Sequence, residues 1–419
     1  MDHVIGTYQQ RLWDRHAERL CGPEVDDEVE LEGLLDGEVG GLRAFEDLDA
    51  ISALASCPAW TRLANQSSGQ SSLTQEAEAM VHVGVDLHKR MSQIAVLTED
   101  GEIAQRRLAN DPERLEAFFA QLPPRTPVAI EASGTWWWLV DLLERAGHRP
   151  VLSNPKQTKA IAAARLKNDR VDAERLALLL RGDLLPTVWI PPAELREARE
   201  LIRHRVQLVW LRGEVRNRLL AMLARRNLQP TSGKSWLTVR GQRELHALPL
   251  TPIAATIRED YRALLPLLDE QIRRLDDDLR QRWGEDPRVR RLMTLPGVGA
   301  FIAIVLVMEL GDIQRFPSAK HVASYIGLTP RVRASADRIR SGHISKEGNR
   351  LLRWVLVLAA TQAARQPGPL RAWFRAMKQR KGTKIARVAL ARRLVEIVYH
   401  VWKHDCDYFT VLRRGAVRG

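Results

Sequence analysis

The spacing of hydrophobic residues indicates one segment of mixed strands and helices, followed by two helical segments. Short apolar runs between turn residues predict five strands, the first three consecutive and hairpin-like, at 81–87, 91–98, 102–108, 127–131 and 150–153. Helical periodicity predicts four helices, at 111–121, 135–146, 156–165 and 169–181. Residues 80–185 are therefore expected to form an α/β domain.

The next segment, 190–285, has the spacing of long packed helices. Apolar residues recur every seven positions at Leu201, Leu208, Val215 and Met222, and later step by three and four at Leu265, Leu268, Ile272, Leu275 and Leu279. The second series is the seam of a coiled coil, so we expect a coiled-coil arm, with a loop-rich insert at 230–252. Helix packing within one chain and a dimerisation arm both fit, and the strict spacing favours self-association as a dimer or tetramer.

Residues 288–419 are expected to form a mainly helical C-terminal domain. LPGVG (295–299) opens an apolar helix over 300–310 and resembles the turn of a helix-hairpin-helix element. Its glycines would let the backbone approach a phosphate, or would simply allow a tight turn between helices. A second helix is expected over 385–402, capped by Thr383, with basic residues that would bind a nucleic-acid backbone or be solvated.

Charge is distributed unevenly along the 419 residues. The net charge is +13, yet residues 1–80 contain 5 Lys and Arg against 16 Asp and Glu. The strongly basic remainder favours a polyanionic partner, and nucleic acid is the commonest one. Residues 1–79 are expected to be an acidic extension, either a genuine appendage or an over-extended reading frame that precedes Met80.

Cysteine content and hydropathy bear on the compartment. Three cysteines, none in a CxxC pair, favour a reducing cytoplasm, where a nucleic-acid-binding protein would associate with the nucleoid. We find no apolar stretch of about 18 residues or more, so no membrane partner is expected.

Four carboxylates occupy positions where an α/β core would bring them together. Asp86 lies in the first strand, Glu131 ends the fourth, and Asp169 and Asp172 are three apart at a helix start. Three adjacent strands followed by alternating helices and strands is the order of the ribonuclease-H-like fold. Oxygen-only ligands suit Mg²⁺, with Mn²⁺ as the alternative, and the expected chemistry is metal-assisted attack on a phosphodiester.

Taken in order, the sequence blocks closely resemble the DEDD-type insertion-sequence transposases, which are serine-dependent recombinases guided by a bridge RNA. The blocks are GVDLHK (84–89), IEASGTW (130–136), KNDRVDAERLA (167–177), LPGVGAFIA (295–303), SYIGLTPRVRAS (324–335) and GHISKEGNRLLR (342–353). The resemblance implies a RuvC-like domain whose Asp86, Glu131, Asp169 and Asp172 bind Mg²⁺. It also implies donor DNA, target DNA and a guide RNA as partners.

The same resemblance points to Ser335 as a DNA-joining nucleophile. The family often has Ser-Gly at this place, whereas this chain has Ser335-Ala336, and Ser341 and Ser345 lie nearby as alternatives. A covalent phosphoserine would keep the energy of the cut bond for rejoining, and the chain has no GxxxxGK[ST] loop for ATP. Candidate nucleic-acid contacts are basic residues, namely Lys89, Arg331, Arg333, Arg338, Arg340, Lys346 and Arg350.

Two alternative functions remain open at this point. A hydrolytic RuvC-like nuclease of the junction-resolvase type would need the four carboxylates alone, and the block around Ser335 argues against it. A non-catalytic nucleic-acid-binding protein would not need four acids. We therefore expect a transposase that cleaves and exchanges DNA strands through a serine–DNA intermediate.

Overall fold

The structure, a computed structural model, describes residues 81–161, 169–231, 235–236, 238–335 and 338–415, with side chains except at 332–341. The acidic extension predicted at 1–79 lies outside the described residues. The chain divides at Pro191 into an α/β unit and a helical unit.

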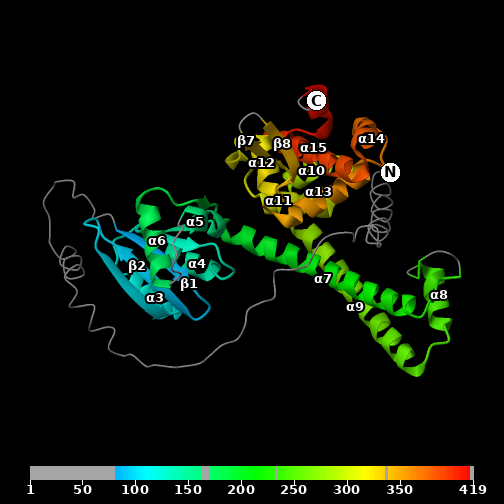
Figure 1. The fold of residues 1–419 in the computed structure, drawn as a ribbon, viewed down its shortest axis with the longest axis horizontal. Coiled ribbons are helices and arrows are strands. Elements are labelled where there is room, and N and C mark those ends of the chain that lie inside the picture. Colours follow the sequence, from blue (N-terminus) through cyan, green and yellow to red (C-terminus); the bar gives the residue numbers. More distant parts are fainter. Residues whose placement is uncertain (1–80, 162–168, 232–234, 237, 336–337, 416–419) are drawn as a thin grey trace. The chain divides into compact units, whose positions relative to one another are not determined.

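The α/β unit is built on a six-stranded sheet in the order β3-β2-β1-β4-β5-β6 (Figure 1). Its strands are β1 (His82–Leu87), β2 (Met91–Leu97), β3 (Ile103–Ala109), β4 (Pro127–Glu131), β5 (Arg149–Ser153) and β6 (Thr187–Val188). β2 pairs antiparallel with β1 and β3, whereas β1, β4 and β5 are parallel. The five predicted strands and the mixed α/β sheet are confirmed; the two-residue β6 was not predicted.

Helices cover both faces of this sheet. The covering helices are α3 (Pro112–Phe119), α4 (Trp137–Arg145) and α6 (Asp169–Arg181), and α5 (Pro155–Ile161), which has no buried residue, follows β5. Alternate residues of β1 and β4, such as Val83, Val85 and Ile130, form one core with residues of α3 and α4. Residues that point the other way are small, and Ala129 packs against Leu176 of α6. The period of two along each strand therefore separates a bulky face from a face that α6 approaches closely.

Gly84 of β1 is the point of closest approach between the sheet and α6. A Cβ at this position would clash with the carbonyl oxygen of Ala173 and would lie 2.6 Å from the backbone nitrogen of Ala177. Only glycine therefore fits between β1 and α6.

The helical unit begins with two 32-residue helices, α7 (Ala193–Ala224) and α9 (Pro252–Trp283), which run side by side (Figure 1). They are antiparallel, because ion pairs join Arg205 to Asp276 and Arg212 to Asp269. Of the seam predicted on α9, Leu268, Ile272, Leu275 and Leu279 are buried and Leu265 is half-buried within one chain, as the intramolecular alternative requires. On α7, two of the residues that recur every seven positions, Val215 and Met222, are buried, and the other two, Leu201 and Leu208, are half-buried. Helix α8 (Val239–Ala247) lies in the insert predicted as a loop.

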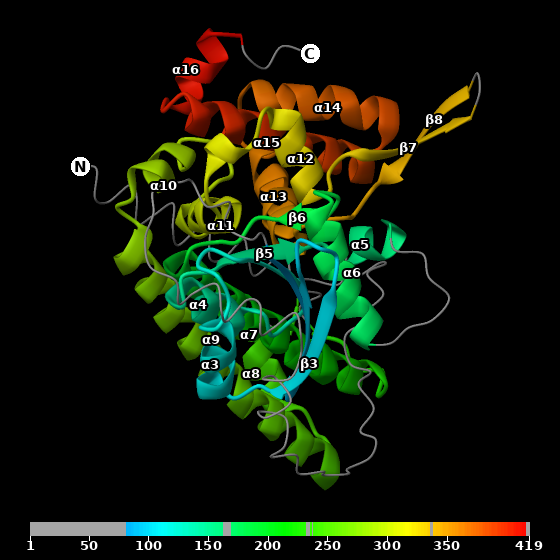
Figure 2. The same cartoon turned by 90° about the vertical axis from the view of Figure 1, so that its left-hand side faces the viewer.

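The rest of this unit packs around the apolar helix α11, which begins and ends where the sequence predicted (Figure 2). The elements of the helical unit after α9 are α10 (Pro287–Leu292), α11 (Ala300–Leu310), the 3-10 helix η3 (Ile313–Arg315), α12 (Ala319–Ile326), α13 (Arg350–Ala363), α14 (Pro369–Lys381), α15 (Thr383–Lys403) and α16 (Tyr408–Arg413). Thr383 is the first residue of α15 rather than its cap, which is Gly382, so the predicted cap is wrong. Gly297 faces the Ala359 carbonyl of α13, so helix packing accounts for this glycine.

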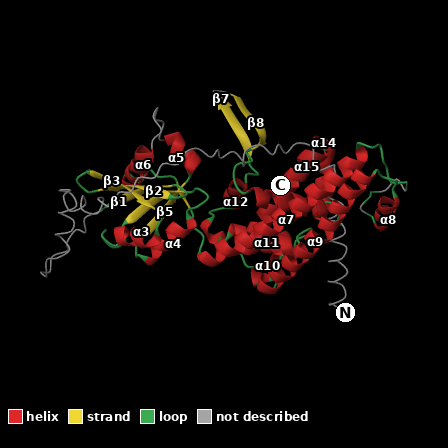
Figure 3. Ribbon diagram, turned by 90° about the horizontal axis from the view of Figure 1, so that it is seen from below, coloured by secondary structure: helices red, strands yellow, loops and turns green. Residues whose placement is uncertain are grey.

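A two-stranded hairpin, β7 (Pro330–Ser335) and β8 (Arg338–Ile344), interrupts these helices (Figure 3). The sequence did not predict it. None of the described helices is both long enough and apolar enough to cross a membrane.

Replacing Gly84 with alanine should force α6 away from the sheet. We expect Gly84→Ala to lower the free energy of unfolding of the α/β unit by about 1–3 kcal/mol, the usual cost of overpacking, measured by urea denaturation of the full chain. Amide hydrogens of α6 should also exchange faster with solvent.

Gly213→Ala is the matched control, because Gly213 lies within α7 and a Cβ there would meet no atom within 4 Å. It should leave stability unchanged or raise it by about 0.5–1 kcal/mol. Equal stability of the Gly84→Ala variant and the native chain would contradict the close approach described above.

Candidate functional site

The site begins with an aspartate in the middle of the sheet. Val83 and Val85 point toward α3 and α4, so Gly84 and Asp86 point to the opposite face. Asp86 lies two residues beyond the glycine on which α6 rests, and its side chain is 14% exposed. A carboxylate at this depth needs a cation or hydrogen-bond donors to offset its desolvation.

The first turn of α6 brings two more carboxylates to Asp86. Asp169 is the first residue of this helix and Asp172 follows one turn later, while Ala173 sits against Gly84. Acids in a first turn are favourable for the helix itself, because the N-terminus carries a partial positive charge. Arg175 donates a hydrogen bond of 3.2 Å from Nη1 to Oδ1 of Asp172.

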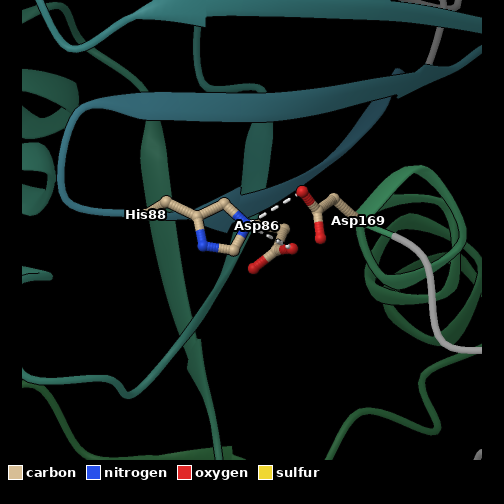
Figure 4. Close-up of side chains that lie close together, drawn as sticks. All are labelled: Asp86, His88 and Asp169. Atoms are coloured by element: carbon tan, nitrogen blue, oxygen red, sulfur yellow. Dashed lines mark ion pairs between the residues drawn. The ribbon is translucent and has the colours of Figure 1, made fainter. Parts of the chain in front are cut away.

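His88 links the two elements, as Figure 4 shows. Its Nε2 atom lies 3.2 Å from Oδ2 of Asp86 and 3.2 Å from Oδ2 of Asp169. Ligand atoms of all three residues lie within 4.8 Å of one another. His88 was not predicted to be a site residue, although its position two residues after Asp86 was a signal of a shared face.

Glu131 belongs to the same edge of the sheet by backbone register. β1 and β4 are parallel, and Val85 pairs with Ile130, so the residues that follow are Asp86 and Glu131. Like Asp86, Glu131 comes two residues after a small residue that faces α6. The close cluster of ligand atoms contains Asp86, His88 and Asp169, and Glu131 and Asp172 are not members of it.

Charge crowding perturbs the site. Burial raises the pKa of the Asp86 carboxyl above its ordinary value, and the negative charges of Asp169 and Asp172 raise this pKa further, while His88 lowers it. A divalent cation would relieve both the desolvation and the repulsion. The donors present, carboxylate oxygens and one imidazole, are thus suited to hold a divalent metal ion.

Two buried or half-buried amides hold α6 beside the sheet. Gln93, which pairs with Asp86 across the β1–β2 ladder, donates through Nε2 to Oε1 of Gln105 on β3 at 3.3 Å. Gln105 in turn donates through Nε2 to the Arg170 carbonyl at 3.4 Å and to the Glu174 carboxylate at 3.3 Å. Neither glutamine was predicted to belong to the site. The available signal was the presence of two polar residues, Ser92 and Gln93, in the mainly apolar β2.

The proposed nucleophile lies in the other unit. Ser335 ends β7, where its backbone pairs with Arg338, and Val332 pairs with Ser341; these side chains lie outside the described ones. Ser345 follows β8, and its backbone N–H donates to the Thr329 carbonyl. The structure therefore places Ser335 and Ser341 in the hairpin strands and Ser345 just after them, without distinguishing between the three candidates.

The basic residues predicted to contact nucleic acid lie in different settings. Lys89 is exposed in the turn between β1 and β2, and Lys346 is exposed just after β8. Arg331 donates through Nη2 to the Ser345 carbonyl at 3.2 Å, and the Arg350 guanidinium lies 5.5 Å from the centre of the Trp210 ring. The side chains of Arg333, Arg338 and Arg340 lie outside the described ones.

A buried glutamate anchors the segment after this hairpin. Glu309 of α11 is fully buried and accepts two hydrogen bonds from the Arg203 guanidinium, at 2.8 and 3.0 Å. Asn349, the N-cap of α13, donates to the same carboxylate at 2.7 Å and accepts from the Leu352 backbone nitrogen. The chain that follows β8 is therefore tied to both α11 and α7.

Two family profiles match the chain. The profile of a DEDD-type IS110 transposase matches residues 83–227, and the profile described as transposase IS116/IS110/IS902 family matches residues 289–375. The first match spans Asp86, Glu131, Asp169 and Asp172, and the second spans Ser335.

Whole transposases are similar over most of their length. One from Sinorhizobium fredii is 29% identical over 79% of this chain and 86% of its own length. A family 20 transposase from Pseudomonas aeruginosa is 26% identical over 78% of this chain and 98% of its own length. The transposase of insertion sequence IS1328 from Yersinia enterocolitica is 27% identical over 76% of this chain and 96% of its own length. The carboxylate cluster, both profile matches and these relatives agree, and the chain belongs to the IS110 family of DEDD-type DNA transposases.

Proposed function

We propose that the chain cleaves and exchanges the DNA strands of an insertion sequence in a Mg²⁺-dependent reaction that passes through a serine–DNA intermediate. The observation that carries the metal-dependent part is the meeting of Asp86, His88 and Asp169 at the edge of the sheet. The strand order β3-β2-β1-β4-β5, with three antiparallel strands and then parallel ones, supports a ribonuclease-H-like, RuvC-like domain.

The proposed ligands of Mg²⁺ are the carboxylates of Asp86, Glu131, Asp169 and Asp172. When bound, the ion supplies positive charge to the oxygens of the reacting phosphodiester. His88 contacts two of these carboxylates, so it would hold them in place or take up a proton at its Nε2 atom. Gln93 and Gln105 would keep the first turn of α6 in register with Asp86.

The proposed serine step conserves bond energy. The Oγ atom of Ser335 forms a bond to phosphorus, a deoxyribose oxygen leaves that phosphorus, and the hydroxyl proton passes to a base. Attack by a hydroxyl of another strand then reverses these changes and releases the serine. The backbone of Ser335 at the end of β7 pairs with that of Arg338, so the sequence places a basic residue opposite the proposed nucleophile in the hairpin, and arginine is suited to pair with phosphate oxygens.

The proposed partners follow from the family resemblance rather than from contacts. Donor and target DNA are the substrates, a guide RNA selects them, and the chain assembles as a dimer or tetramer. The basic chain after Met80 is suited to bind both nucleic acids.

Asp86→Asn tests the metal centre. We expect Mg²⁺-dependent DNA cleavage to fall by about 100-fold or more, beyond the 10- to 100-fold typical when only a supporting residue is changed. In EDTA the same variant should unfold at a higher temperature than the native chain, because it removes a buried charge that Asp169 and Asp172 repel. Added Mg²⁺ should raise the melting temperature of the native chain and not that of the variant.

Asp100→Asn is the control, since Asp100 is an exposed carboxylate in the turn between β2 and β3. It should keep both the cleavage activity and the response to Mg²⁺. Full cleavage by the Asp86→Asn variant, or an equal rise with Mg²⁺ in both proteins, would refute the metal centre.

Ser335→Ala tests the covalent intermediate. With Mg²⁺, guide RNA and labelled donor DNA, the native chain should give a protein–DNA adduct on a denaturing gel that disappears after protease treatment. The variant lacks the attacking oxygen and should give no adduct and no strand exchange.

Ser341→Ala and Ser345→Ala are the matched controls and should keep the adduct. Loss of the adduct in one of these two instead would move the nucleophile to that serine. Free cleaved DNA without an adduct, in amounts that Ser335→Ala leaves unchanged, would favour a hydrolytic nuclease.

A further inference from the structure

The C-terminal hairpin of helices α14 and α15 has many cations and a single carboxylate, Glu396, which lies far from the connection between the helices and pairs with Arg392. From Arg350 to Val395 the chain has twelve Lys and Arg residues and no Asp or Glu. α14 ends at Lys381 and α15 begins at Thr383, and the two helices lie next to each other (Figures 1 and 2), with the guanidinium of Arg393 5.2 Å from the centre of the Trp373 ring. The connection at Gly382 therefore forms the end of a helical hairpin.

Five basic residues surround this connection, and we call them the basic tip. They are Lys378, Arg380, Lys381, Lys384 and Arg387. All are exposed except Arg387, which is half-buried. Among the described residues, none of the five forms an ion pair or a hydrogen bond through its side chain.

Exposed arginines on the long helix α9 of the same unit, in contrast, form ion pairs. On α9, Arg273 pairs with Glu270 and Arg282 pairs with Asp278, each within one helical turn. Such i,i+3 and i,i+4 pairs are the usual way in which an exposed helix balances its charge. The basic tip has no such balance, so its charge repels itself and is available to an external anion.

Helix electrostatics do not explain the whole tip. Lys378, Arg380 and Lys381 occupy the last turn of α14, where cations stabilise a helix. Lys384, however, is the second residue of α15, where the partial positive charge of the helix disfavours a cation, and Arg387 follows in the next turn. The cap of α15 is Gly382, which offers no side-chain acceptor to the first N–H groups. Both features mean that a bound anion would stabilise the tip.

The composition of the tip favours duplex DNA over an unpaired strand. Proteins bind single strands by stacking bases on exposed aromatic rings, in addition to charge. The tip has no aromatic residue, and Trp373 and Phe374, which lie earlier in α14, are half-buried against the core. We propose that the basic tip of the α14–α15 hairpin binds the phosphate backbone of duplex DNA without reading its sequence. The matched family profiles end at residue 375, before the tip.

The test measures how the affinity for DNA depends on salt. A triple variant, Lys378→Gln, Lys381→Gln and Lys384→Gln, should bind a short duplex of arbitrary sequence more weakly than the native chain in fluorescence anisotropy. Each lost phosphate contact should reduce the slope of log K against log salt by about 0.9, so the slope should fall by about 2–3. Replacing the same lysines with arginine should restore it.

The control removes equal charge elsewhere in the unit. Arg273→Gln, Arg282→Gln and Arg290→Gln change three exposed arginines that pair with carboxylates, and the slope should stay that of the native chain. Equal effects of the two triple variants, or an unchanged slope in the first, would overturn the proposal. Weaker binding of single-stranded RNA with unchanged binding of the duplex would overturn the assignment to duplex DNA.

Discussion

The close approach of α6 to the sheet at Gly84 is the constraint on which the acidic site depends. Because no Cβ fits there, the helix backbone rests directly on β1, and its first turn lies beside the residue two positions further along the strand. That residue is Asp86, so one glycine determines how closely Asp169 can come to it. The opposite face bears the large side chains, including Val83, Val85 and Ile130, and supplies the apolar burial that holds the sheet together.

This arrangement holds the negative charges of Asp86, Asp169 and Asp172 close together, where they repel one another. Asp86 is mostly buried, and the neighbouring acids raise its pKa, so the site opposes folding when no cation is present. Gln93 and Gln105 hold α6 with hydrogen bonds that do not themselves involve the carboxylates. The carboxylate oxygens of Asp86 and Asp169 therefore remain available to a metal ion, although His88 contacts both. A site that costs stability and is held by separate contacts is typical of one built for chemistry.

Local patterns predicted the sheet well, because its strands are apolar runs with turns between them. Residue order and type also indicated which carboxylates to examine. The roles of His88, Gln93 and Gln105 depend on which strands pair and in which register, and one sequence does not contain that information. The β7–β8 hairpin was missed because its strands are rich in arginine and serine rather than in alternating apolar residues. The Thr383 cap failed because Gly382 and Thr383 are both acceptable there, and the helix begins at Thr383, two residues earlier than expected.

The buried Glu309 indicates how the helical unit can support an exposed hairpin. An unpaired carboxylate at this depth would be strongly destabilising, and Arg203 and Asn349 supply the hydrogen-bond donors that pair it. Asn349 caps α13 and follows β8 by five residues, so the chain leaving the hairpin is fixed even though its strands are polar. Arg199, one helical turn before Arg203, donates to the carbonyls of Met308 and Glu309 and fixes α7 to the same helix. The hairpin that carries the proposed nucleophile thus leads into a segment held by buried hydrogen bonds to both α11 and α7.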